Sequence, residues 1–367
     1  MAAAENIDMK HTPASLFKNF LILALVIGVV GTALAAEGLT DAEKAQKRDD
    51  LDKFFTGALQ RSKAEPVNEA PDVFLFTANA STRYGYESNV DLNNTEDGDE
   101  FYQEKVGAKA EYAPEFWSWG NNRLSTGVEG RYEYWGYFDR DDLNRQNAVV
   151  SPYLKLDLGK YLTLETAYVF RVRNYDSLDQ LNYLANGATV SVEHKLAPGL
   201  SQKGTFLYEH RGYSSDRPSL TSSGLLQGDD RKDEYYETTY GWRYHTGRWT
   251  FNLEGDWVWN DSNDQYFDYN DYQEGGLDGS VSVRLTNRLI LTGFGGWQHR
   301  MYDSRPITND FTVTQEDDWY FTGGRLFYAL NPSSGIDLTF TYYENDSNDA
   351  GHDYSDTITS VGYHLYF

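Results

Sequence analysis

Beyond residue 70 the chain alternates between apolar and polar side chains with a period of two. In one stretch an apolar set alternates with a polar set: Trp249, Phe251, Leu253, Trp257 and Trp259 against Thr250, Asn252, Glu254, Asp256 and Asn260. Because successive side chains on a strand point to opposite faces, this pattern predicts a strand with one aromatic face and one charged face.

The same pattern recurs in pairs of strands, joined alternately by a short turn and a longer acidic connection. The expected strands are 73–87, 100–113, 122–137, 146–158, 161–175, 181–196, 201–213, 233–246, 248–262, 271–285, 289–304, 316–330, 336–347 and 355–367. Short connections rich in Gly, Asn or Pro are 158–161, 197–200, 245–248, 285–288 and 331–335, with a longer one at 113–122. Long connections include 88–100, 214–232, 260–270 and 345–356.

Short turns on one side and long loops on the other are typical of outer-membrane barrels. We therefore expect an all-β fold, a transmembrane antiparallel up-and-down β-barrel of about 14 strands. An even count puts both ends of the barrel on one side. Twelve or sixteen strands are also compatible with this pattern, because the predicted boundaries carry an error of about two to four residues.

A soluble β-sandwich is the alternative, but it would place aliphatic side chains on its apolar face. This chain instead has 29 Tyr, 19 Phe and 9 Trp, and the apolar face of its predicted strands is rich in Tyr and Trp. The mean hydropathy of −0.64 fits a barrel, because half of each strand then faces a polar lumen. The absence of Cys is compatible with an oxidising envelope compartment.

The N-terminus resembles an export signal. Residues 19–35 contain an apolar segment of about a dozen residues that ends in Ala33-Leu34-Ala35, an A-x-A cleavage pattern. We expect residues 1–35 to be a signal peptide, whose true start is possibly Met9, because Glu5 and Asp8 are unusual in such a segment. An N-terminal membrane anchor is the alternative. The expected domains are then 1–35, 36–70 and a barrel over 71–367.

Residues 40–62 are expected to form a short periplasmic helix. Thr40 and Glu43 have the spacing of a capping box. One helical face carries apolar residues at i, i+3, i+4 and i+8, namely Leu51, Phe54, Phe55 and Leu59. This helix could plug the barrel or dock a periplasmic partner, and a simple tether is an equal alternative.

The polar face of each strand provides the candidate lumen residues. They are Lys109, Glu129, Arg131, Lys155, Asp157, Glu165, Arg171, Arg173, Arg211, Glu237, Arg243, Glu254, Asp256, Arg284 and Arg325. The acidic loops and a net charge of −24 should attract cations to the mouth of a channel. Alternatively, the inward charges pair with one another and close the lumen.

Catalytic patterns are weak. The histidines are scattered, although His352 with Asp353 and His299 with Asp303 have the residue types of a rim hydrolase. The loop from Asp346 lacks acids at positions where a calcium loop needs them, so we expect no catalytic residue, no metal site and no cofactor. The expected partners are outer-membrane lipid and lipopolysaccharide, without nucleic acid.

Two elements resemble known proteins. The final residues, TITSVGYHLYF, resemble the C-terminal strand of bacterial outer-membrane β-barrels, whose terminal Phe belongs to the insertion signal. This likeness implies that Val361, Tyr363, Leu365 and Phe367 form that signal and are recognised by the barrel-assembly machinery. The element from Tyr84 to Val90, YGYESNV, is similar to one in β-barrel porins of the BBP2 type.

The resemblance implies a channel-like protein of the bacterial outer membrane, in a family sometimes associated with envelope polysaccharide systems. The function expected from the sequence is therefore a porin-like channel for passive diffusion of small solutes that favours cations. The alternatives are a barrel for export of envelope polysaccharide or a surface protein, and a hydrolase at the rim.

Overall fold

The computed structural model describes residues 74–90, 92, 98–114, 117–178, 181–214, 231–263 and 270–367. Its strands are β1 Phe74–Glu87, β2 Asp99–Tyr112, β3 Ser118–Trp119, β4 Asn122–Tyr137, β5 Arg145–Leu158, β6 Leu162–Tyr175, β7 Tyr183–Ala197, β8 Leu200–Tyr213, β9 Lys232–Thr246, β10 Trp249–Ser262, β11 Tyr272–Arg284, β12 Leu289–Ile307, β13 Asp310–Asn331, β14 Ser334–Ser347 and β15 Tyr354–Tyr366. Two single-turn 3-10 helices, η2 (Asp141–Leu143) and η4 (Ala350–His352), lie between strands. Among the described residues, no helix is long and apolar enough to cross a membrane.

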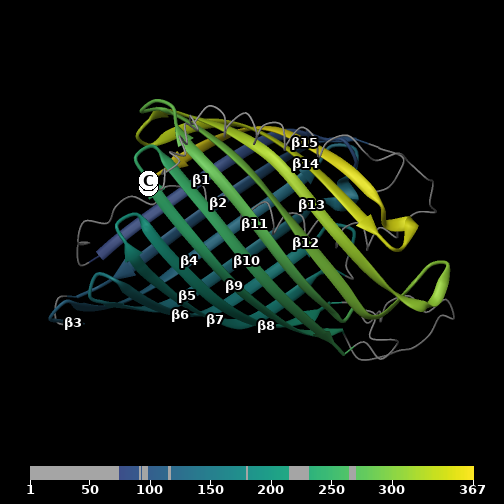
Figure 1. The fold of residues 1–367 in the computed structure, drawn as a ribbon, viewed down its shortest axis with the longest axis horizontal. Helices are drawn as coiled ribbons and strands as arrows, with labels where there is room; N and C mark the ends of the chain where they lie inside the picture. Colours follow the sequence, from purple (N-terminus) through teal and green to yellow (C-terminus); the bar gives the residue numbers. More distant parts are fainter. Residues whose placement is uncertain are drawn as a thin grey trace, which may run out of the picture. The chain divides into compact units, whose positions relative to one another are not determined.

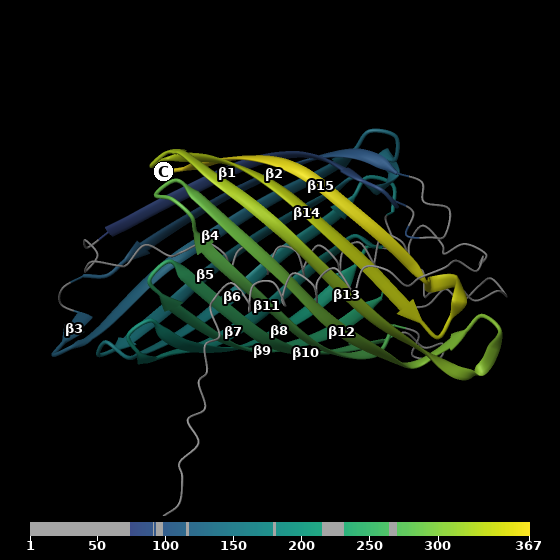
Figure 2. The same ribbon diagram turned by 45° about the horizontal axis from the view of Figure 1, so that its top comes forward.

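The strands form one antiparallel sheet that closes on itself (Figures 1 and 2). The two-residue strand β3 pairs only with β4, and the other strands of the 15-stranded sheet form the ring. The ring is completed where β2 pairs with β4 and where β1 pairs with β15, the first strand with the last. The expectation of a closed all-β barrel with 14 spanning strands is therefore confirmed.

The short connections lie where the sequence predicts them. Gly159, Gly199 and Gly247 each adopt a positive φ, of 61°, 79° and 58°, in the turns after β5, β7 and β9. This backbone conformation strains residues with a Cβ, so glycine is the residue that these turns need. The chain end Phe367 lies at the same end of the barrel as these turns, and its backbone bonds Ala78.

The outer face of the barrel is apolar. Within each strand, nearly all large exposed hydrophobic side chains share one parity, which means that their residue numbers are all odd or all even. Examples are Phe251, Leu253, Trp257 and Trp259 on β10, and Ile336, Leu338 and Phe340 on β14. An outward band of this kind is what a barrel needs in order to contact lipid.

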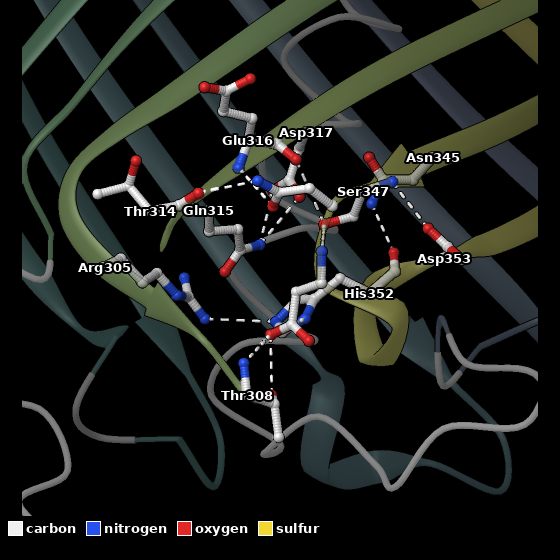
Figure 3. A network of polar contacts seen from close by, with 12 residues as sticks. Arg305, Thr308, Thr314, Gln315, Glu316, Asp317, Asn345, Ser347, His352 and Asp353 are labelled. Carbon is white, nitrogen blue, oxygen red and sulfur yellow. Dashed lines mark hydrogen bonds and ion pairs between the residues drawn. The ribbon is translucent and has the colours of Figure 1, made fainter. Parts of the chain in front are cut away.

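The β12–β13 hairpin is longer than the sequence suggests. The strands were expected to end at residue 304 and begin at residue 316, yet they continue to Ile307 and start at Asp310, with a register shift after Met301. Figure 3 shows the polar network that holds this extension against the β14–β15 connection. The Asp349 carboxylate accepts hydrogen bonds from the backbone and hydroxyl of Thr308, at 3.1 and 2.9 Å.

Candidate functional site

The candidate site is the inner wall of the barrel. Residues paired directly across an antiparallel ladder lie on the same face of the sheet, so the register identifies that wall strand by strand. It consists of odd-numbered positions on β1, β2, β4 to β9, β13 and β14, and of even-numbered positions on β10 to β12 and β15. All fifteen candidate lumen residues occupy these positions.

Contacts between strands that are not neighbours show that this face is the concave one. The Nε of Arg171 on β6 lies 2.9 Å from the Glu209 carboxylate on β8, across β7. The guanidinium of Arg83 on β1 lies 3.3 Å from Asp337 on β14, across β15. Such contacts require side chains that converge, as they do inside a barrel.

One buried cluster lies at the seam where the barrel closes. The side chain of Asp337 is 0% exposed and accepts bonds from Arg325 at 2.8 Å, from Arg83 at 3.3 Å and from His364 at 2.5 Å. The hydroxyl of Thr339 donates a further bond at 2.8 Å. A buried carboxylate needs partners of this kind. Four strands around the seam, β1, β13, β14 and β15, therefore share one carboxylate.

The half of the wall near the long loops carries arginines stacked on aromatic rings. The guanidinium of Arg300 is buried between the rings of Tyr272 and Trp319, at 4.2 and 4.5 Å, and pairs with the Glu274 carboxylate. Arg211 lies 3.5 Å from the centre of the Tyr235 ring. Stacks and pairs this well packed are consistent with a structural role.

The charges on β4 and β5 are more exposed. Arg131 and Glu129 form an ion pair at 2.6 Å with side chains 54% and 32% exposed. Lys155 and Asp157 lie 3.9 Å apart and are 21% and 30% exposed. Water can reach these pairs, so their electrostatic coupling is weak.

The wall of β9 to β11 is rich in acids. Glu254 pairs across the ladder with Asp278, and Asp256 and Glu237 lie on the same face nearby. At the end near the short turns this wall carries basic residues instead, Arg243 and the exposed Arg284. Among the described residues, no group of three or more His, Asp or Glu side chains is arranged to hold a metal ion.

Several inner-wall residues were not among the candidates predicted from sequence. They are Lys105, Glu193, Lys203, Asp233, Glu274, Asp278, Arg300 and Asp317. Each shares the parity of the charged positions in its own strand, so parity extended along every strand would have found them. The notable omission is Lys203, which lies on the same face as Glu209 and Arg211.

The possible rim histidines are not arranged as the sequence suggested. His299 lies 3.1 Å from Asp318 on β13 rather than beside Asp303, because residues four apart on a strand are separated by about 13 Å. His299 also shares the outward parity of Trp297. His352 pairs with Asp349 at 3.2 Å, whereas the Asp353 carboxylate accepts the backbone N–H of Ser347.

Predictions for residues 1–35 and for the helix at 40–62, with Leu51, Phe54, Phe55 and Leu59, lie outside the described residues. The other predicted segment, the terminal strand, is described. Val361, Tyr363 and Phe367 are exposed on the outer face, and Leu365 shares their parity.

A closed antiparallel barrel with an apolar outer face, a charged inner wall and short turns at one end is a bacterial outer-membrane β-barrel of the porin type. The family model described as "Putative beta-barrel porin 2" matches residues 274–367, which confirms the resemblance expected from the sequence over the last quarter of the chain. That match contains the terminal strand but not the Tyr84–Val90 element. No curated protein sequence matches the chain.

Solved barrels show a similar arrangement of strands. The outer membrane channel DcaP of Acinetobacter baumannii is 10% identical, with a TM-score of 0.45 over 80% of this chain and 97% of that one. Outer-membrane expressed OmpT of Vibrio cholerae is 10% identical, with a TM-score of 0.44 over 82% of this chain and 99% of that one. A bacterial polysaccharide outer membrane secretin is 10% identical, with a TM-score of 0.46 over 78% and 98%.

Proposed function

We propose that the barrel is a passive outer-membrane channel for small solutes and that it favours cations. The observation that carries this proposal is the set of water-accessible charges on the inner wall, represented by Arg131 with Glu129 and by Lys155 with Asp157. A barrel with a purely structural interior would bury and pair such groups, as this one does at Asp337.

The cation preference is supported by the acidic wall of β9 to β11. Glu237, Glu254, Asp256, Glu274 and Asp278 share this wall. Negative groups in a narrow cleft between low-dielectric walls concentrate the field and raise the local concentration of cations. The net charge of −24 adds to this effect at longer range.

We also propose that the barrel is not an enzyme. The pairing of His299 with Asp318 on the outer face, and the burial of His352 among loop hydrogen bonds, support this view. Neither histidine is hydrogen-bonded to a serine hydroxyl in the described part of the chain, so neither has the nucleophile–base contact of a serine hydrolase.

The apolar outer face supports further proposals about partners. We propose that it contacts outer-membrane lipid and lipopolysaccharide. We also propose that the outward-facing terminal set Val361, Tyr363, Leu365 and Phe367 is recognised by the barrel-assembly machinery during insertion. The exposure of the Phe367 ring, 73%, leaves it available for such recognition.

The proposal is tested by planar-bilayer recording of the refolded chain under a salt gradient. We expect steady conductance, and we expect the sign of the reversal potential to show that cations pass more readily than anions. The double variant Glu254→Gln with Asp256→Asn should shift that potential toward zero, because it removes two negative charges from the inner wall. Glu104→Gln removes a charge from the outer face and should leave the potential unchanged.

A folded barrel without conductance would overturn the proposal and favour the export alternative. A conducting barrel whose reversal potential does not respond to the double variant would keep the channel but remove the assignment of cation preference to this wall.

A further inference from the structure

The connections at the two ends of the barrel carry opposite charge. Four long connections contain acidic residues and no Lys or Arg, namely 88–98, 176–182, 263–271 and 348–353. Three short connections contain a basic residue and no acidic one, namely Lys160 in 159–161, Arg248 in 247–248 and Arg288 in 285–288. Figure 1 shows the marked C-terminus, at the end with the short turns, opposite the extended β12–β13 hairpin. We call these two ends the loop side and the turn side.

Two further cations lie on the inner wall at the turn side. Lys195 has the inward parity of β7 and Arg284 has that of β11. Together with Lys160, Arg248 and Arg288 they form what we call the basic rim, and all five side chains are exposed. Within the described part of the chain, none of the five has a carboxylate within 4.0 Å of its charged nitrogen atoms. Their charges therefore act on the solution at this opening.

Backbone hydrogen bonds join successive turns, so the basic rim is continuous along one arc of the opening. The backbone N–H groups of Lys195, His245 and Arg284 donate to the carbonyls of Tyr161, Gly199 and Arg248, at 2.7, 2.7 and 2.9 Å. The first of these bonds places Lys195 beside the turn that carries Lys160, and the last places Arg284 beside Arg248. The positive charges are therefore attached to a rigid sheet edge and follow one another around the lumen.

Farther from the turns the inner wall becomes acidic. One ladder row across β7 to β11 consists of Glu193, Lys203, Gly241, Glu254 and Asp278. Carboxylates outnumber cations in this row. An ion that enters from the turn side therefore meets positive charge first and negative charge afterwards.

We infer that the channel conducts asymmetrically and passes the larger current when the loop side is at positive potential. Under that polarity cations enter at the acidic end and anions enter at the basic rim, so each end raises the concentration of the ion that it admits. The opposite polarity drives each ion through the end that repels it, and the lumen is depleted of ions. The inference rests on the proposed channel function and adds a direction to it.

Single-channel recording of the refolded full chain in symmetric KCl tests the inference. At 0.1 M salt, where charges act over about 10 Å, we expect the current to be at least about twofold larger at one polarity than at the other. At 1 M salt the screening length shortens to about 3 Å, and the ratio of the two currents should fall toward one.

The sign of the asymmetry requires the orientation of each channel. Since the chain contains no Cys, Ser333→Cys provides a single thiol in the exposed turn between β13 and β14, on the turn side. A bulky maleimide–polyethylene glycol reagent reaches this thiol only from the compartment that the turn side faces, and its coupling should lower the current. We expect the larger current when the other compartment is positive. A larger current at the reverse polarity would contradict the inference.

Two triple variants separate the charge of the basic rim from its shape. Lys195→Gln with Arg248→Gln and Arg288→Gln removes three positive charges, so the ratio at 0.1 M salt should fall toward one and cation preference should rise. Lys195→Arg with Arg248→Lys and Arg288→Lys keeps the charges and should keep the ratio. If the Gln variant is as asymmetric as the parent, the basic rim is not the cause of the asymmetry.

The same recordings distinguish failure of this inference from failure of the proposed function. A barrel that conducts equally at both polarities in 0.1 M salt remains a channel, and only the asymmetry is refuted. A folded barrel without conductance contradicts the channel itself, and the asymmetry is refuted with it.

Discussion

The closing seam around Asp337 and the more exposed charges on the inner wall of β4 and β5 use the same residue types in different ways. These exposed charges, Glu129, Arg131, Lys155 and Asp157, are called the exposed band below. At the seam, a fully buried Asp337 is shared by Arg83, Arg325 and His364. On the band, Glu129 and Arg131 form a close pair that water reaches. Burial makes a pair hard to break, and exposure makes it weak but accessible to ions. Removing one partner from the seam should therefore cost the barrel far more than removing a charge from the band, whose charges face water inside the barrel.

The largest expected effect comes from breaking the seam. Asp337→Ala removes the carboxylate that Arg83, Arg325 and His364 contact, so we expect a loss of about 3–5 kcal/mol in the free energy of unfolding. Denaturant titration of the barrel refolded in lipid vesicles measures it. The matched control is Asp157→Ala on the exposed band, which should cost at most about 1 kcal/mol. Equal losses would abolish the distinction between the two regions.

A charge introduced on the outer face gives a second loss in the free energy of unfolding, with which the loss for Asp337→Ala can be compared. Leu277 is 49% exposed on the lipid-facing side near the middle of β11. Leu277→Arg should cost about 2–4 kcal/mol in the same titration, because a cation is then placed in lipid. Thr189→Arg places the same charge on the inner wall, where we expect a change of about 0.5 kcal/mol or less. A small cost for Leu277→Arg would argue against lipid contact at this face.

Variants of the terminal residue Phe367 separate the contribution of its backbone to barrel closure from the contribution of its ring to insertion. The backbone of Phe367 exchanges two hydrogen bonds with Ala78, at 2.8 and 3.0 Å, as the barrel closes. Deleting Phe367 should cost about 1–3 kcal/mol, whereas Phe367→Ala keeps both bonds and should cost less. If the ring belongs to the insertion signal, Phe367→Ala should still reduce the amount of barrel assembled in cells. Normal assembly of Phe367→Ala would contradict that role.

The smallest effect on stability is expected at the band, together with a clear effect on current. Glu129→Gln should change the free energy of unfolding by at most about 1 kcal/mol. The reversal potential of Glu129→Gln should shift in the direction of lower cation selectivity. That of Arg131→Met should shift in the direction of higher cation selectivity, because the two variants remove opposite charges. Bilayer recordings under one salt gradient compare them. Shifts of the same sign in both variants would show that the band does not act through its charge.

Much of the fold could be read from the sequence, because strand alternation and turn chemistry are local. The predicted strand over 122–137 matches β4, and Gly159 and Gly247 lie in turns as expected. The β12–β13 hairpin was predicted too short, because residues 305–310 have little alternation and contain Pro306. Its pairing depends instead on contacts with the β14–β15 connection, such as Thr308 with Asp349.

The candidate site was predicted less completely. Parity alone placed Glu254 and Arg243 on the inner wall, since each strand carries its own pattern of two faces. Parity could not show that Lys203 and Glu254 lie on either side of Gly241, because that requires the register of three strands.

The sequence by itself therefore determined the class of fold, the apolar and polar face of each strand, and the ends that carry turns, whereas it left the strand number open between twelve and sixteen. These properties follow from the period of two and from the backbone needs of glycine. Only the tertiary structure decided which charges meet. Arg83 and Asp337 are 254 positions apart, and they meet because β1 pairs with β15 in one particular register. That register, together with the stagger that closes a barrel, is a property of the whole sheet and is not encoded in any single strand.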